Sequence, residues 1–358
     1  MFLIRSKSRF SIGTSVVSLV VLTVIVAIVV SQGTTSRPLP ARKVFSAVVP
    51  PTMRQCADCH QDVCETFATA PHRLTLMRAN SPIALSHFSG KEYTFANGGP
   101  TVRFENRNAE LWLDSAAVPS PLRVDWIFGS GQHAQTPVSV VLNPDGQTEL
   151  LQHRVSWYPA GQLGPTPGLE PDELSQEGYY QVSRRDDHVT TMDCFECHVT
   201  HLPHDDGRID EARIITGVGC DRCHIGGKDH MAGIENETGL MEKWSNLTPL
   251  ESVNRCGECH RRADQLTDAE LDPERAILPR FASVGLAMSA CFKQQDDVRI
   301  AGQSQPRLDC LTCHDPHRPA HSDAQFYVEK CVDCHGSKSG QASECASEPM
   351  SSNCLLCH

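Results

Sequence analysis

The longest apolar run of the chain lies near its N-terminus. It extends from Ile12 to Val30 and follows three basic residues, Arg5, Lys7 and Arg9. A run of this length is just enough to span a bilayer, and the basic residues place the short N-terminus in the cytoplasm. No small-residue cleavage site follows at once. We expect an uncleaved signal anchor, with a removed signal peptide as the alternative, and the rest of the chain outside the cytoplasm.

Alternating apolar and polar residues appear further along the chain. They predict strands at 101–104 and 110–113, and the run from Val138 to Leu142 predicts a third. The turn sequence Asn143-Pro144-Asp145-Gly146 precedes an apolar stretch at 150–157, which predicts a hairpin. This part of the chain holds three of the four tryptophans and four of the five tyrosines, enough for an ordinary aromatic core. We expect a small β-rich insert here.

The chain from residue 194 onward has a different character. It contains only six aromatic side chains, too few to bury a conventional core. Helical patterns are short, with segments predicted at 268–276 and 279–289. Something other than apolar side chains must therefore fill the interior of this part.

A motif that recurs along the chain indicates what occupies this interior. Cys-x-x-Cys-His occurs seven times, and no Cys-x-x-Cys lacks the histidine. This is the attachment signature of c-type haem, in which two thiols bond one porphyrin and the histidine is the proximal iron ligand. Zinc or disulfide pairs, the alternative, need no histidine at that position. The cysteines are Cys56, Cys59, Cys194, Cys197, Cys220, Cys223, Cys256, Cys259, Cys310, Cys313, Cys331, Cys334, Cys354 and Cys357, and the histidines are His60, His198, His224, His260, His314, His335 and His358.

The spacing of the motifs predicts the fold class. Six of them fall within residues 194–358, which leaves room only for a short helix carrying each motif and a loop to the next. We expect a mainly α or irregular multihaem cytochrome c fold, with short helices around stacked haems and the β-rich insert between the first and second motifs. The expected segments are a signal anchor at 1–31, a Pro- and Gly-containing linker at 32–51, a first haem site at 52–75, the β-rich insert at 76–193 and a six-haem domain at 194–358.

Seven irons would also need sixth ligands. Seventeen histidines less the seven of the motifs leaves ten candidates. Two of them, His201 and His317, each lie three residues after a proximal histidine. They are better placed to reach a neighbouring iron than the iron of that proximal histidine. We expect His87, His153 and His188 to be non-ligands, and Met288 and Met350 to serve in packing. The predicted sixth ligands are His72, His133, His201, His204, His230, His317 and His321.

Three cysteines stand outside the motifs. Cys64, Cys291 and Cys345 are odd in number, so they cannot all pair internally. We expect one disulfide and one free thiol. Seventeen cysteines in total are typical of an oxidising compartment.

The charge of the chain bears on its partners. The formal net charge of −11 leaves no basic stripe for phosphates, which excludes a nucleic-acid partner. It suits a redox partner with a basic docking face, and it also keeps an exported protein soluble.

The chain resembles the cytochrome c-554-type family of exported bacterial multihaem proteins over most of residues 52–336. The resemblance implies a periplasmic electron-transfer protein in which His72, His230 and His317 are distal ligands. Cys64 and the seventh motif depart from the family pattern. The phrases that carry the resemblance are Cys56-Ala-Asp-Cys-His with Thr69-Ala-Pro-His72, Gly129-Ser-Gly-Gln-His133, Val155-Ser-Trp-Tyr158, Gly219-Cys-Asp-Arg-Cys-His224 with His230, Met288-Ser-Ala-Cys-Phe292 and Leu311-Thr-Cys-His-Asp-Pro-His317.

Three functions follow as hypotheses. The first is a periplasmic electron carrier without catalytic residues, passing electrons along closely packed haems between a protein donor and an acceptor. The alternative is a multihaem oxidoreductase acting on a small nitrogen or sulfur compound at one five-coordinate haem. The third is a module of a membrane electron-transfer complex. Groups in the insert that could bind an anion for the second hypothesis are His133, Tyr158, Tyr179, Tyr180, Arg184 and Arg185.

Overall fold

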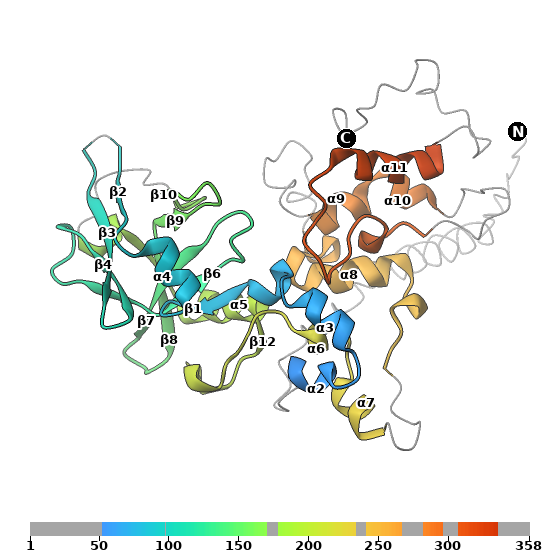
Figure 1. Ribbon diagram of the computed structural model, residues 1–358, viewed down its shortest axis with the longest axis horizontal. Helices are drawn as coiled ribbons and strands as arrows, with labels where there is room; N and C mark the ends of the chain where they lie inside the picture. The colour runs from blue at the N-terminus through green and yellow to red at the C-terminus, as the bar shows by residue number, and fades with distance from the viewer. Residues whose placement is uncertain are drawn as a thin grey trace, which may run out of the picture. The chain divides into compact units, whose positions relative to one another are not determined.

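The computed structural model describes residues 52–96, 98–169, 178–233, 241–266, 282–295 and 307–335 (Figure 1). The predicted signal anchor, the linker to residue 51, the helix predicted at 268–276 and the seventh motif lie outside these ranges. Within them, no helix is both long enough and apolar enough to cross a membrane.

One antiparallel sheet has four strands in sequential order, β2 (Glu92–Thr94), β3 (Thr101–Arg107), β4 (Glu110–Asp114) and β5 (Leu122–Val124). Alternate residues of β3 and β4 are buried, as the polar and apolar alternation predicts. The fully buried Phe104 pairs with Leu113 across the two strands and packs edge-on against Phe88.

A second antiparallel sheet has the strand order β1-β6-β7-β8-β11. Its central pair, β7 and β8, is the predicted hairpin, in which Val140 lies opposite Leu150. Gly146 closes the turn with a φ of +81°, a conformation that favours glycine. The strands are β1 (Leu76–Arg78), β6 (Trp126–Phe128), β7 (Thr136–Leu142), β8 (Thr148–His153) and β11 (Ser183–Asp186).

The apolar stretch at 150–157 differs from the single strand expected there. It breaks at Arg154, whose backbone amide donates to the carbonyl of Val182, and the chain then enters β9 (Val155–Trp157). β9 pairs with β10 (Leu163–Pro165) instead of continuing along β7. A change of strand partner leaves no mark on the hydrophobic pattern when both halves are buried.

Short helices carry the six motifs that the structure describes. A Cys-x-x-Cys spacing on a helix places both thiols on one side, because residues three apart are neighbours there. The helix α9 (Ala282–Met288) lies within the predicted segment 279–289. The helices that carry motifs are α2 (Met53–Ala57), α5 (His188–His198), α6 (Cys220–Cys223), α8 (Pro249–His260), η9 (Cys310–Thr312) and α11 (Ala324–His335).

The remaining helices are α3 (Gln61–Phe67), η1 (Pro71–Leu74), α4 (Pro82–Phe88), η2 (Gly178–Gln181), η3 (Glu211–Arg213), α7 (Gly227–Gly233), η5 (Trp244–Asn246), η6 (Ala263–Gln265), α9 (Ala282–Met288) and α10 (Ala290–Gln294). Two short ladders pair β12 (Val199–His201) with β15 (Ile215–Thr216), and β13 (His204–Asp205) with β14 (Arg208–Ile209).

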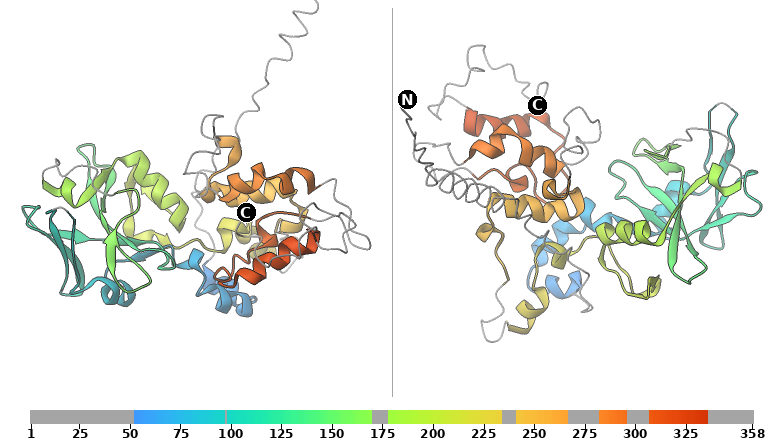
Figure 2. Two further views of the ribbon diagram at one scale, coloured as in Figure 1. Left: turned by 90° about the horizontal axis from the view of Figure 1, so that it is seen from above. Right: turned by 180° about the vertical axis from the view of Figure 1, so that it is seen from behind.

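The helix α5 packs against the five-stranded sheet and contacts β8 and β11 (Figure 2). Phe195, the residue between the cysteines that follows Cys194, is fully buried in a cluster with Trp126 and Leu150. Phe128 packs against Phe195 on one side and against the ring of His198 on the other. The second motif is therefore held in place by an apolar core.

His153 is fully buried inside the same sheet. Its Nε2 lies 2.9 Å from the hydroxyl of Ser139 in β7, and its Nδ1 lies 2.7 Å from the hydroxyl of Ser183 in β11. Burial disfavours the charged imidazolium and lowers the pKa of His153 from 6.5 to about 3. His153 therefore links β7 and β11 from its position in β8.

This burial makes the sheet sensitive to acid. Below about pH 6.5 the unfolded chain binds a proton at His153 that the folded chain does not, so stability falls as the pH falls from 6.5 towards 3. His153→Gln removes the titration and can bond both serines. Hydrogen exchange of β7, β8 and β11 should show a loss of at most about 1.4 kcal/mol per pH unit in the wild type and a smaller slope in the variant. Equal slopes would contradict this account.

Candidate functional site

Pairs of histidine rings lie close together in the helical part of the structure. Each pair joins one motif histidine to one of the predicted sixth ligands, and the two partners come from distant parts of the sequence. The pairs, with the separation of their ring centroids, are His60 and His230 at 6.4 Å, His260 and His72 at 6.1 Å, and His224 and His317 at 6.1 Å.

These separations can be compared with two imidazoles on opposite sides of one metal ion. A ligating nitrogen lies about 2.0 Å from a first-row metal and the ring centroid about 1.1 Å beyond it, which separates the two centroids by about 6.2 Å. The interplanar angles of 28°, 87° and 10° are all compatible, because each ring can rotate about its bond to the metal. The three pairs therefore fit a haem iron held between two histidines.

Hydrogen bonds orient several of these rings. Nδ1 of His72 lies 3.3 Å from the carbonyl oxygen of Pro316, and Nδ1 of His198 lies 3.0 Å from that of Thr75. Nδ1 of His317 lies 3.0 Å from Oδ1 of Asp315. A partner on Nδ1 leaves Nε2 as the nitrogen available to a metal and fixes the plane of the ring.

Burial lowers the pKa of three motif histidines, His198, His224 and His260. For His224 and His260 the charges of neighbouring histidines lower the pKa further, those of His317 and His72 respectively being the largest of these. A metal ligand must be a neutral imidazole, so this environment favours the form that binds iron.

Cysteines of different motifs also meet. The thiols of Cys56 and Cys220 are hydrogen-bonded, and burial together with Cys56 raises the pKa of Cys220 to about 12. A hydrogen bond with Cys197 lowers the pKa of Cys259 to about 6, with the charge of Arg222 acting in the same direction.

The third such contact is between Cys256 and Cys310. The three contacts bring together the attachment points of the first and third, the second and fourth, and the fourth and fifth motifs. The fourth motif, at the end of α8, thus borders two others.

The segment that carries His72 is fixed to the segment before the third motif. Nη1 of Arg73 donates to the carbonyl of Thr216 over 3.0 Å, and the amide of Val218 donates to the carbonyl of His72 over 2.8 Å. Gly217 lies between these contacts with a φ of +75°, and a Cβ there would approach the Arg73 carbonyl oxygen to 2.1 Å. Only glycine allows this close crossing.

The fifth motif lines a cavity of about 290 Å³. The predicted ligand His321 also lines it, with its ring stacked on Phe326 at 4.0 Å. The ring of Tyr327 lies 5.9 Å from that of His314, and its hydroxyl donates to the carbonyl of His321 over 3.0 Å. The structure therefore brings His314 and His321 to one cavity without stacking their rings.

The other predicted ligands lie elsewhere. His201 is buried in β12, and burial followed by the charge of Arg213 lowers its pKa. His133 and His204 are exposed, and the described part of the chain shows no ring contact between either of them and a motif histidine. The side chains of Cys334 and His335, and all of the seventh motif, lie outside the described residues.

Two of the histidines expected to be non-ligands have local partners, as His153 does. The ring of His87 stacks on Trp157 at 3.7 Å, and its Nδ1 lies 2.7 Å from Oε1 of Gln135. Nδ1 of His188 lies 3.3 Å from the carbonyl oxygen of Thr148.

The cysteines outside the motifs do not pair with each other in the described residues. Cys64 is a buried free thiol and Cys291 an exposed one, and Cys345 lies outside the described ranges. Burial raises the pKa of Cys64, with the nearby Cys56 adding to the shift.

The basic groups proposed for anion binding are already paired. Nε of Arg184 lies 2.7 Å from Asp186, and Nε of Arg185 lies 2.5 Å from Glu149. Each guanidinium group therefore already has a carboxylate partner.

Two contributors were missed by sequence reasoning. The carbonyl oxygens of Thr75 and Pro316 accept hydrogen bonds from the rings of predicted ligands, and a backbone carbonyl has no sequence signature. Thr75 adds a reciprocal contact, since its hydroxyl donates to the carbonyl of His198 over 2.9 Å.

The chain is similar to several known proteins. Residues 169–225 match the family described as cytochrome c554 and c-prime. The chain is similar to the dissimilatory sulfite reductase MccA of Wolinella succinogenes, with 23% identity over 175 residues, covering 40% of this chain and 22% of that protein. The chain thus spans less than a quarter of the length of that relative. The structure of the outer cell wall cytochrome OcwA aligns with a TM-score of 0.34 and 17% identity over 59% of this chain and 37% of that one, a score too low to establish a common fold.

The crossing at Gly217 gives a test of how the His72 segment is held. Gly217→Ala should lower the free energy of unfolding by about 1–2 kcal/mol through its left-handed backbone, and by a further 1–3 kcal/mol, roughly, because the Arg73 backbone must move. Gly161→Ala is the matched control, with a φ of +82° and no atom within 4 Å of the added Cβ. Chemical denaturation measures both, and equal losses would show that the crossing is not tight.

Proposed function

Because the chain is a multihaem c-type cytochrome, we propose that it is an electron conduit carrying seven covalently attached haems on the periplasmic side of the inner membrane. Electrons would enter from a membrane or periplasmic donor and leave to an acceptor along closely packed haems, with short helices around the stacked porphyrins. Covalent haem supplies the redox chemistry, and the polypeptide sets ligation, spacing and exposure.

The facing histidine rings carry this proposal. In the pairs of His60 with His230, His260 with His72, and His224 with His317, the ring separation fits one iron between two imidazoles. An iron with both axial positions filled has none for a substrate, so it can only gain and lose electrons. Iron held between two histidines therefore supports a role in electron transfer.

The contacts between motif cysteines support the packing of the haems. Each thiol would bond the edge of a porphyrin, so hydrogen-bonded thiols of two motifs bring two porphyrin edges together. Close edges allow electrons to pass from haem to haem.

A multihaem cytochrome exchanges electrons with redox partners. The net charge of −11 suits a partner with a basic docking face. Membership of a membrane electron-transfer complex, through the predicted N-terminal anchor, is a second arrangement that the sequence suggests.

The alternative is an oxidoreductase for a small nitrogen or sulfur compound with one five-coordinate haem. One relative is named as a sulfite reductase. His314 borders a cavity, and the ring contact that the described residues show for it is with Tyr327. Against it, Arg184 and Arg185 are paired with carboxylates. The conduit remains the better supported function.

Electron paramagnetic resonance of the oxidised protein tests the ligation. Removal of a sixth ligand leaves ferric iron five-coordinate and therefore high-spin. We expect His72→Ala, His230→Ala and His317→Ala each to add a high-spin signal of about one haem per chain. His87→Ala, which removes a histidine stacked on Trp157, should add none.

The same spectrum of the wild type separates the two functions. Low-spin signals alone would favour the conduit. A high-spin component of one haem in the wild type would favour the oxidoreductase, and unchanged spectra of the three variants would contradict the ligand assignment.

The predicted N-terminal anchor has its own test. We expect alkaline carbonate to leave the protein in the membrane fraction of its native host, because the apolar run at 12–30 is long enough to span a bilayer. Release into the soluble fraction, with an N-terminus that begins after residue 30, would instead show a cleaved signal peptide. Protease treatment of spheroplasts should degrade the protein in either case, and full protection would contradict a periplasmic location.

A further inference from the structure

The fifth motif begins at a buried carboxylate. Asp309, which precedes Cys310, is 3% exposed. Its Oδ1 accepts a hydrogen bond from the amide of Leu311 over 2.9 Å, and its own amide donates to the hydroxyl of Thr312 over 3.1 Å. These bonds cap the single turn η9 that presents the motif.

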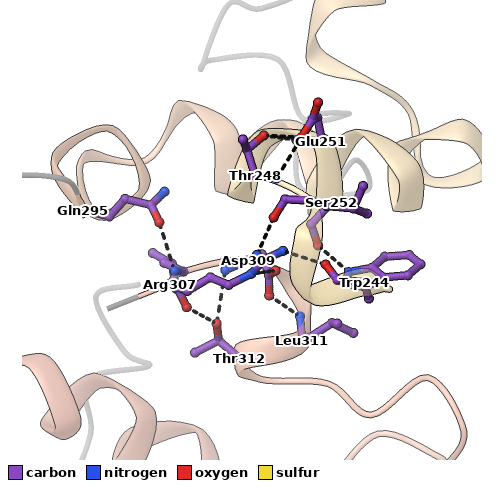
Figure 3. Close-up of polar contacts among 11 residues, drawn as sticks. Trp244, Thr248, Glu251, Ser252, Gln295, Arg307, Asp309, Leu311 and Thr312 are labelled. Atoms are coloured by element: carbon purple, nitrogen blue, oxygen red, sulfur yellow. Dashed lines mark hydrogen bonds and ion pairs between the residues drawn. The ribbon is translucent and has the colours of Figure 1, made fainter. Parts of the chain in front are cut away.

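The second carboxylate oxygen of Asp309 faces Arg307, whose Nε donates to it over 2.8 Å. The guanidinium continues to a different part of the chain (Figure 3). Nη1 donates to the carbonyl of Leu247, and Nη2 donates to that of Trp244 over 3.5 Å. One side chain thus connects the cap of the fifth motif to the segment before α8.

Hydrogen bonds join that segment to α8. Nε1 of Trp244 donates to the hydroxyl of Ser252 over 2.7 Å. Thr248 and Glu251 form a reciprocal capping box at the start of the helix. Because α8 ends at the fourth motif, these hydrogen bonds connect Arg307 to the helix that carries that motif.

A neutral contact reinforces the arrangement from α10. Oε1 of the buried Gln295 accepts from the amide of Leu308 over 3.0 Å, and its Nε2 donates to the carbonyl of Phe292 over 2.9 Å. The chain entering the fifth motif is therefore held by Gln295 as well as by Arg307.

The two motifs joined in this way also touch at their sulfurs, since Cys256 and Cys310 are hydrogen-bonded. We propose that Arg307 and Asp309 act as positioning residues, a clamp that fixes the separation of the fourth and fifth haems and thereby sets electron exchange between them. This proposal rests on the proposed conduit function.

The chemistry of the clamp favours arginine. A guanidinium presents five donors in a planar fork, enough for a carboxylate and two carbonyls at once. A lysine ammonium can pair with Asp309 but does not match that geometry. Removal of Arg307 leaves a buried carboxylate without its counter-charge, which displaces the turn that carries Cys310.

Variants separate the clamp from a local cap. Asp309→Asn keeps an oxygen for the Leu311 amide but turns an NH2 group towards Arg307, whereas Asp309→Ala loses both contacts. Arg307→Ala and Arg307→Lys remove the carbonyl contacts, the second without loss of charge. Arg103→Ala is the matched control, because Arg103 pairs with Glu92 in the four-stranded sheet.

The full-length protein is used in every case. Haem content is measured first, and the magnetic coupling between oxidised haems and the rate of interhaem transfer after photoreduction follow. The signals of the fifth haem are those lost when Cys310 and Cys313 are both replaced by alanine, and those of the fourth haem are those lost when Cys256 and Cys259 are both replaced.

We expect slower transfer and weaker coupling for that haem pair in Asp309→Asn and Arg307→Ala, with the double variant no worse than either single one. Arg307→Lys should show the same change in milder form, and it carries the test if the alanine variants lose haem. Arg103→Ala should match the wild type.

Different failures are distinguishable. If Asp309→Asn behaves as the wild type while Asp309→Ala does not, Asp309 is only a local cap and the clamp is overturned. Unchanged transfer and coupling in all four clamp variants overturn it as well. If the wild type shows no interhaem transfer, the proposed conduit function itself fails.

Discussion

The close approach of imidazole rings in three pairs is the constraint that links distant segments in the helical part of this protein. Ring centroids at 6.1–6.4 Å bring together segments that are far apart in the sequence. Apolar packing does not explain these meetings, because few apolar residues are buried there. Beyond residue 210 of the described chain they are Val218, Leu247, Val253, Val284 and Val328. In the proposed arrangement, iron bonds and porphyrins would take the place that leucine and phenylalanine have in other protein cores.

Two modes of stabilisation therefore coexist in one chain. The sheets are held by buried side chains such as Phe104 and Trp126, and they extend this order to the second motif through Phe195. The helical part is short of apolar contacts and uses directed polar ones, of which the fork of Arg307 is an example. Directed bonds fix distances more tightly than apolar contacts do, which suits a function that depends on separation.

Much of this could be predicted from the sequence, and the limits have physical causes. Strict alternation predicted β3 and β4, the turn at residues 143–146 predicted the β7–β8 hairpin, and the motifs predicted the cofactor. The histidine partners could be named as candidates but not paired, because ring pairing follows from the path of the chain. Nothing in the spacing of His60 and His230 joins them. The break at Arg154 was hidden because both flanking strands are buried.

The pairing of His60 with His230 also bears on the order of biogenesis. A ribosome delivers the first motif early, but the ring that faces it belongs to α7 and emerges only after the third motif has been made. If this pair coordinates one iron, as proposed, the first site lacks its second ligand until α7 has been made. The proposed N-terminal site is thus completed by a residue that follows the third motif, so a chain that stops before α7 would lack one of the two proposed ligands.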